Sequence, residues 1–280
     1  MIRRRFNSNK HEVFNYANYM TIEAIDDIVT VSLPRTSMYG INGIGWRRYS
    51  GMIELRKGQM LSVKDNVDSQ YGNIVIKGKC NLRGNCMSLI YGDNANEAIM
   101  PAYAFEDLFK NNADIQSVDK TFLPATTLAN YCYSFMFYGC TGLTTAPELP
   151  ATTLADSCYS HMFQSCTYLT TAPELPATTL ECDCYQFMFY DCTYLTTAPE
   201  LPATTLVSRC YDSMFDECRK LNYIKMLATD ISASNCLFNW VYNVSSTGTF
   251  VKNPYMTSLP PATSSNSYAG IPMGWTVQNA

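Results

Sequence analysis

The chain has 280 residues, a net charge of −4 at pH 7 and 47% hydrophobic residues. A protein that binds nucleic acid normally carries a basic patch, and this charge provides none, so we expect no nucleic-acid partner. No run of about 18 consecutive apolar residues occurs, which excludes a membrane-spanning helix. We therefore expect no insertion into a membrane.

We expect residues 1–16 to form an N-terminal arm. The arm begins MIRRRF and lacks an apolar stretch of about seven residues, so it does not resemble a secretion signal. Residues 17–97 follow, with strand-like alternation in segments such as IVTVSLP and GNIVIKG, separated by Gly, Asn and Asp. They predict a small antiparallel β-sandwich domain.

The rest of the chain repeats with a period of 26 residues. The segment LPATTL begins at Leu123, Leu149, Leu175 and Leu201, without an insertion between copies. A period of about 20 to 50 residues is typical of a solenoid, in which each coil buries its apolar face against its neighbours. Looser copies, YAFEDLFKNNADI and MLATDISASNCLFNWV, are expected to close the ends. We predict coils over residues 98–252 and a capping segment over 253–280.

Within each copy, five positions keep the residues Cys, Tyr, Met, Phe and Cys, the last four at offsets of 1, 4, 5 and 8 from the first. Residues at this spacing lie on one side of a helix, so the offsets predict a short helix with a fixed inner face. The segment TYLTTAPELPATTL contains two prolines and predicts two extended pieces joined by a turn. The expected fold class is an α/β repeat solenoid of short parallel strands and short helices, preceded by the β-sandwich.

The run CYSHMFQSCTYLTTAPELPATTL resembles the BspA-like leucine-rich repeats of gut Bacteroidales surface proteins and of proteins encoded by their phages and prophages. The resemblance covers residues 98–280, including the tail segment GIPMGWTV. It implies a leucine-rich-repeat-like solenoid that serves as a binding or structural surface and has no shared catalytic residues. It does not identify a ligand.

Eight of the twelve cysteines form two ladders along the repeats. On a helix the two members within a coil would be about 12 Å apart, and helices of successive coils about 8 to 10 Å apart. Both exceed the Cα separation of about 7 Å that a disulfide tolerates. We therefore expect free, buried cysteines that act as small apolar residues. The ladder residues are Cys132, Cys140, Cys158, Cys166, Cys184, Cys192, Cys210 and Cys218.

Two further cysteines, Cys80 and Cys86, are close enough in sequence to bridge a hairpin, although assembly in a reducing compartment opposes this. The sequence has no CxxC motif and only two histidines, His11 and His161, so we expect no metal site and no cofactor.

Tyrosines at positions that differ between copies are the candidate binding residues. They are Tyr138, Tyr168, Tyr190 and Tyr194. Exposed tyrosines provide a large contact area at little entropic cost; the alternative is that they lie flat on neighbouring side chains. Tyr168 and Tyr194 occupy the same place in successive coils, where the flanking copies have Gly142 and Lys220. They are expected to form a two-ring step on which a glycan or a protein loop stacks.

The sequence contains no nucleophile elbow, P-loop, dinucleotide glycine motif or HExxH, so we expect no enzyme. The leading hypothesis is a structural or attachment protein of a Bacteroidales phage, located in the virion. Its arm and β-domain would contact other virion proteins, and its solenoid a host surface protein or glycan. Homo-oligomerisation is left open. The alternative is a bacterial cell-surface adhesin, which the basic start MIRRR without an export signal disfavours.

Overall fold

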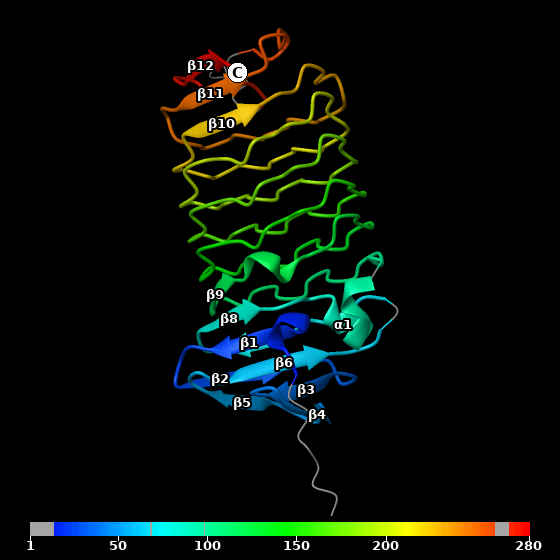
Figure 1. Cartoon of the computed structure of the whole chain (residues 1–280). Coiled ribbons are helices and arrows are strands. Elements are labelled where there is room, and N and C mark those ends of the chain that lie inside the picture. The colour runs from blue at the N-terminus through cyan, green and yellow to red at the C-terminus, as the bar shows by residue number, and fades with distance from the viewer. Residues whose placement is uncertain (1–13, 68, 98, 261–268) are drawn as a thin grey trace, which may run out of the picture.

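The computed structural model describes residues 14–67, 69–97, 99–260 and 269–280, without the side chains of 96 and 97. Most of the predicted arm (residues 1–13) and residues 261–268 of the predicted capping segment lie outside this range. The chain forms an elongated stack, in which the N-terminal strands occupy one end and the C-terminal strands the other (Figure 1).

Eight strands between residues 20 and 83 form the N-terminal end. In β2, Val29 and Val31 are buried and their neighbours are more exposed, the alternation expected of a strand with one face on the core. The strands are β1 (Met20–Ala24), β2 (Ile28–Ser32), β3 (Met38–Ile41), β4 (Ile44–Arg48), β5 (Ile53–Arg56), β6 (Met60–Lys64), β7 (Val75–Lys77) and β8 (Cys80–Arg83). They belong to two sheets, with the orders β4-β3-β6-β1-β8-β9 and β5-β2-β7.

The larger sheet continues into the repeats. Its last strand, β9 (Ile115–Val118), pairs in parallel with β8, whereas the strands before β8 pair antiparallel. The next coil follows through a parallel bridge between Ser117 and Thr145. Buried residues of both sheets and of the coils form one core cluster. The sheet therefore crosses the predicted boundary at residue 97, and the N-terminal end and the coils share a core.

The predicted α/β fold class is wrong. The described residues contain twelve strands in three sheets and one α-helix, α1 (Ser88–Tyr91), of only four residues. Three short 3₁₀ helices, η1 (Tyr16–Asn18), η2 (Gly92–Glu97) and η3 (Lys120–Phe122), precede the regular repeats. None of these helices lies in a segment for which the repeat pattern predicts one.

Each predicted helix is instead a chain of turns with a left-handed residue at every fourth position. In one repeat these residues are Tyr131, Phe135 and Gly139, with φ of 58°, 55° and 68°. The invariant positions thus follow a period of four, which over nine residues resembles the 3.6-residue period of a helix. We call these chains the turn segments. They comprise residues 103–112, 131–140, 157–166, 183–192, 209–218 and 235–244.

Backbone hydrogen bonds in a turn segment alternate between two kinds of partner. The amide of Cys132 donates to Ala129 O within its own coil at 3.2 Å, and that of Tyr133 donates to Cys158 O in the next coil at 3.0 Å. The next two amides repeat the pattern: that of Ser134 donates within its own coil, and that of Phe135 donates to the next coil. A helix would use all of its amides locally. Here every second amide ties one coil to the next.

The inner side chains form stacked columns through the coils. Phe137 and Phe163 have ring centroids 5.7 Å apart and an interplanar angle of 1°, and Tyr133 and Tyr159 are 5.7 Å apart at 12°. All four rings are at most 1% exposed. Aromatic stacking adds about 0.5 to 1.5 kcal/mol per pair beyond the area buried. This gain depends on having the same ring in each copy, which explains why these positions do not vary.

The extended segments of the coils pair in parallel at single bridges, such as Thr127 with Thr153 and Thr145 with Thr171. Besides the pairing of β9 with β8, longer parallel pairing in the described coils occurs at the C-terminal end. There β10 (Tyr223–Met226), β11 (Thr249–Lys252) and β12 (Thr276–Asn279) form a parallel sheet.

Deleting one whole coil, Leu149 to Glu174, should leave a folded protein, because the new junction restores the hydrogen-bond register and each coil contacts only its neighbours. A 13-residue deletion, Leu149 to His161, should abolish cooperative unfolding because it removes the first half of the turn segment 157–166 and leaves a coil of half the required length. Thermal melts followed by circular dichroism compare the two. Equal cooperativity of both variants would contradict the stacked-coil register.

The substitution Gly139→Ala distinguishes a turn segment from a helix, because the two structures predict opposite changes in the free energy of unfolding. In a helix the change would stabilise the protein by about 1 kcal/mol. Gly139 has a φ of 68°, and an added Cβ would lie 2.5 Å from Asn111 Oδ1, so we expect a loss of about 1 to 2 kcal/mol. Chemical denaturation measures the difference. Gly45→Ala is the reference, because Gly45 has a φ of 59° with open space around it and reports the backbone strain alone.

Candidate functional site

The cysteine ladders lie in the interior of the stack. All twelve cysteines are free, including Cys80 and Cys86, and all except Cys182 are buried. In the second ladder each thiol donates to a backbone carbonyl of the preceding coil, as Cys166 Sγ does to Phe137 O at 3.1 Å. Burial raises the pKa of Cys158 to about 12. These thiols therefore remain protonated and serve as packing groups.

Among the described residues, no group of three or more His, Cys, Asp or Glu side chains is placed to hold a metal ion. Two of the candidate binding tyrosines, Tyr138 and Tyr190, lie on the outer surface of the turn segments, which we call the turn face, and the other two, Tyr168 and Tyr194, follow directly after turn segments.

Three rings on the turn face stack along the axis of the coils. Phe135 and His161 are 4.2 Å apart at 7°, and His161 and Phe187 are 4.7 Å apart at 6°. Lys110 Nζ lies 4.6 Å from the centroid of Phe135. We call Phe135, His161 and Phe187 the aromatic ladder. Because its rings cover one another's faces, the ladder presents mainly ring edges to solvent.

The three residues of the aromatic ladder have a strained backbone conformation. Phe135, His161 and Phe187 have φ of 55°, 58° and 53°, a region that bulky residues rarely adopt and that costs about 1 to 2 kcal/mol per residue. Asn239, a residue type that tolerates this conformation, stands at the same place in the last turn segment. The left-handed conformation belongs to the repeating backbone, so only the choice of aromatic side chains distinguishes these three positions from their equivalents in the other coils.

Two of the predicted tyrosines flank the aromatic ladder. Tyr138 lies 5.8 Å from Phe135 and Tyr190 lies 5.7 Å from Phe187, both in tilted contacts. Between them Gln164 is hydrogen-bonded to His161 Nδ1 at 2.5 Å. Burial is the main cause that lowers the pKa of His161, so this side chain is neutral at pH 7. Tyr138 and Tyr190 are half-buried and lie against the ladder.

The other two predicted tyrosines form a pair. Tyr168 and Tyr194 are 55% and 43% exposed, and their ring centroids are 5.3 Å apart at 37°. Lys220 Nζ lies 3.5 Å from the centroid of Tyr194. Since Tyr168 and Lys220 belong to the coils on either side, both faces of Tyr194 are occupied. Tyr168 is the more exposed ring of the pair, and Gly142 stands at the same position in the preceding coil.

A small pocket lies between the aromatic ladder and the first residues of the turn segments. Its volume is about 220 Å³, and we call it the turn-face pocket. It is lined by Glu106, Tyr131, Ser134, Phe135, Ser157, Ser160, His161, Asp183, Gln186 and Arg209. None of these residues was predicted from the sequence as a binding residue. The available signal was that these outer positions change from copy to copy.

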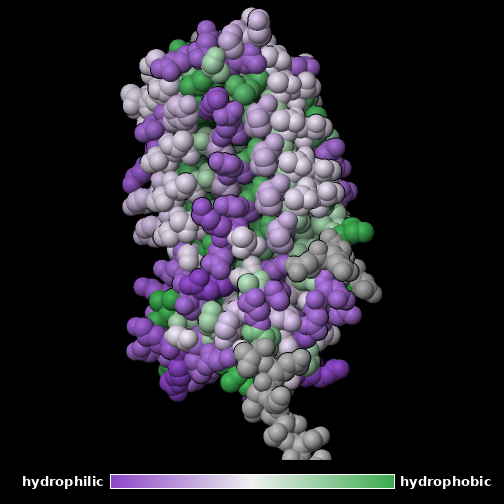
Figure 2. All heavy atoms as spheres, in the orientation of Figure 1, coloured by the Kyte–Doolittle hydropathy of each residue, from purple (hydrophilic) through white to green (hydrophobic). Residues whose placement is uncertain are grey.

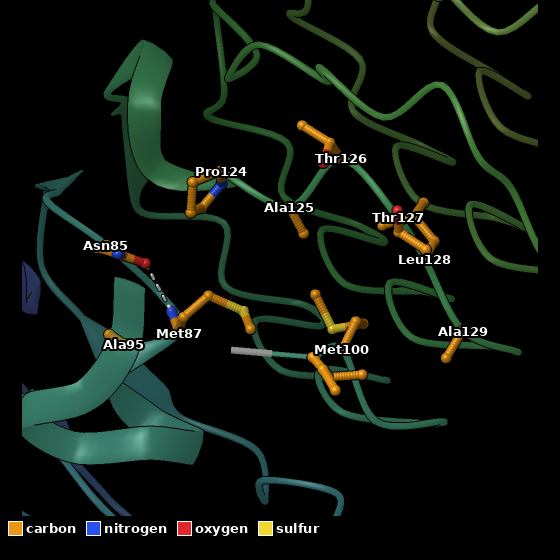
Figure 3. Close-up of a pocket in the computed structure, with 11 residues that line it drawn as sticks. Asn85, Met87, Ala95, Met100, Pro124, Ala125, Thr126, Thr127, Leu128 and Ala129 are labelled. Atoms are coloured by element: carbon orange, nitrogen blue, oxygen red, sulfur yellow. Dashed lines mark hydrogen bonds between the residues drawn. The ribbon is translucent and has the colours of Figure 1, made fainter. Parts of the chain in front are cut away.

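A larger pocket of about 650 Å³ lies where the N-terminal end meets the first LPATTL segment (Figure 3). Met87, Met100 and Leu128 are among its lining residues, and Asn85 Oδ1 accepts a hydrogen bond from the Met87 amide at 2.9 Å. None of the lining residues is titratable. The pocket therefore offers no titratable side chain for acid–base chemistry.

Comparison of the chain with known protein families, with curated proteins and with solved structures finds no match. No helix in the described part of the chain is long and apolar enough to cross a membrane. On the face seen in Figure 2, strongly hydrophilic residues gather over the N-terminal strands, and hydrophobic residues on the coils are scattered. This face carries no broad apolar patch.

A thiol-specific reagent at pH 8 should modify one cysteine of the native protein rapidly and all twelve after unfolding. The fast residue is Cys182, the exposed one, because burial keeps the other thiols protonated and inaccessible. Absorbance of the released thiolate counts the modified residues. In Cys182→Ser the fast phase should disappear. Several fast-reacting thiols in the native wild type would contradict the buried ladders.

Proposed function

We propose that this protein is a non-enzymatic attachment protein of a virion, and that its coil stack carries the surface that contacts the host. The observation that carries the proposal is the set of aromatic side chains held at exposed or strained positions on successive coils. Interfaces concentrate their energy in a few such aromatic anchors. A stack with a continuous core holds these anchors at fixed spacing, which reduces the entropy lost on binding.

The N-terminal sheets suit the role of an anchor to the particle. They share one core with the coils, so a force or a contact at one end is transmitted through a rigid body to the other. The resemblance of the repeats to BspA-like proteins of Bacteroidales and their phages points to the same class of host. A cell-surface adhesin would use the same coil surface, and mass spectrometry of purified phage particles distinguishes the two locations.

The arrangement around His161 favours binding over catalysis. Its ring lies between Phe135 and Phe187, and its Nδ1 is bonded to Gln164. In the described residues no serine hydroxyl has a hydrogen bond to this ring, as a nucleophile activated by a histidine base requires. The histidine thus serves as a flat, neutral ring in a stack.

The double change Tyr168→Ala with Tyr194→Ala should abolish binding of the full chain to host surface material. Both rings are exposed, so the melting temperature should change by the equivalent of about 0.5 kcal/mol or less. Binding to whole host cells, followed with fluorescently labelled protein, is the measurement. The control is Thr170→Ala with Thr196→Ala, two exposed residues of the same coils. Undiminished binding by the folded tyrosine variant would remove this pair from the site.

A further inference from the structure

The turn-face pocket exists because one column of rings stops. Tyr103 and Tyr131 occupy the first position of successive turn segments and stack at 5.0 Å and 3°. The next residue in this column is Ser157, which has nearly the same φ, 54° against 58° for Tyr131. Since serine has no ring, the face of Tyr131 that points away from Tyr103 opens into the pocket. The pocket therefore occupies the place that a ring at position 157 would fill.

The opposite wall of the pocket is an ion pair one coil further along. Arg209 Nε lies 2.8 Å from Asp183 Oδ1, and Arg209 Nη2 donates to Asp183 Oδ2 at 2.8 Å. This paired geometry fixes both side chains and leaves the remaining N–H groups of Arg209 and the remaining lone pairs of Asp183 for a ligand.

The floor of the pocket carries hydroxyl groups that lack partners. Ser134, Ser157 and Ser160 line the pocket and are 1%, 6% and 4% exposed. Over the described residues the structure records no side-chain hydrogen bond for any of the three. Because these hydroxyls have no partner among the described residues and line the pocket, each can donate or accept a hydrogen bond with a molecule that enters it. The pocket therefore offers a polar lining beside the open face of Tyr131.

The size and charge of the pocket narrow the ligand further. About 220 Å³ is below the range of about 300 to 1,000 Å³ typical of drug-sized ligands, so it suits a single ring. Glu106 and Asp183 oppose the one positive charge of Arg209, and His161 is neutral. A carboxylated ring would therefore meet a wall of net negative charge.

We propose that the turn-face pocket binds one neutral monosaccharide residue of a surface glycan, with a face of the sugar ring on Tyr131. A sugar ring has an apolar face of C–H groups and a rim of hydroxyls, which match the tyrosine ring and the surrounding polar groups together. An aromatic ring from a protein partner would stack on Tyr131 equally well but would offer no hydrogen-bonding groups to the serine hydroxyls. This inference rests on the proposed attachment function and specifies its ligand.

Two variants test the pocket in opposite ways. Tyr131→Ala removes the platform, and Ser157→Tyr continues the column of rings and fills the space. The control Tyr103→Ala removes the ring behind Tyr131 without changing a residue that lines the pocket. Thermal melts establish that all three variants fold. If Ser157→Tyr fails to fold, Ser160→Gln blocks the same floor from a position without a left-handed backbone.

Ligand-observed NMR with the full chain measures binding of glucose, galactose, mannose, N-acetylglucosamine and glucuronic acid. We expect at least one neutral sugar to bind the wild type and Tyr103→Ala, with affinity at least tenfold lower in Tyr131→Ala and in Ser157→Tyr. Glucuronic acid should bind more weakly than its neutral counterpart glucose. Absence of any sugar signal that the pocket variants remove, or preference for glucuronic acid over glucose, would overturn the inference.

Binding to whole host cells separates this inference from the proposed function. If cells bind the wild type but no sugar does, attachment stands and the glycan pocket is wrong. If Tyr131→Ala then also loses cell binding, the ring in the pocket comes from a protein and the glycan assignment is again overturned. If cells do not bind the wild type while a neutral sugar does, the pocket stands and the attachment function fails.

Discussion

The structure depends on one alternation of hydrogen bonds in the turn segments. One amide closes a local turn, as Cys132 does with Ala129 O, and the following amide donates to the next coil, as Tyr133 does to Cys158 O. A left-handed residue at every fourth position directs the amides in this way, at about 1 to 2 kcal/mol each for residues other than glycine. The bonds between coils and the stacked inner rings offset this cost. Because both gains require a neighbour, a single coil is not a stable unit.

The period, the inner positions and the drifting outer positions could all be predicted from the sequence. Cys132, Met136 and Phe137, assigned to the inner face, are 0% exposed, and Tyr168 and Tyr194 lie together as their shared position indicates. The helix prediction failed because invariant residues at offsets 1, 4, 5 and 8 fit a period of four as well as a helix. The positive φ of Phe135 and Phe187 could not be predicted from their residue type, because bulky residues rarely adopt this conformation.

The turn-face pocket could not be predicted for a different reason. It arises because Ser157, the residue next to Tyr131 in the column, has no ring. Its walls come from three further coils. Only the stacking of Tyr103 on Tyr131 shows which ring face is left open. The same relation recurs beside Tyr168, whose neighbour in the column is Gly142. On a scaffold that repeats its backbone, substitution of a small residue in one copy is therefore enough to create a ring-sized site.

Scalar coupling across hydrogen bonds in isotopically labelled protein measures the alternation directly. The alternating pattern predicts a coupling between the amide nitrogen of Tyr133 and the carbonyl carbon of Cys158, whose oxygen lies 3.0 Å from that nitrogen. It also predicts one between the amide nitrogen of Cys132 and the carbonyl carbon of Ala129. A helical repeat would instead couple the Tyr133 nitrogen to the carbonyl of Ala129, four residues earlier. Detection of that coupling in place of the one to Cys158 would contradict the turn-segment structure.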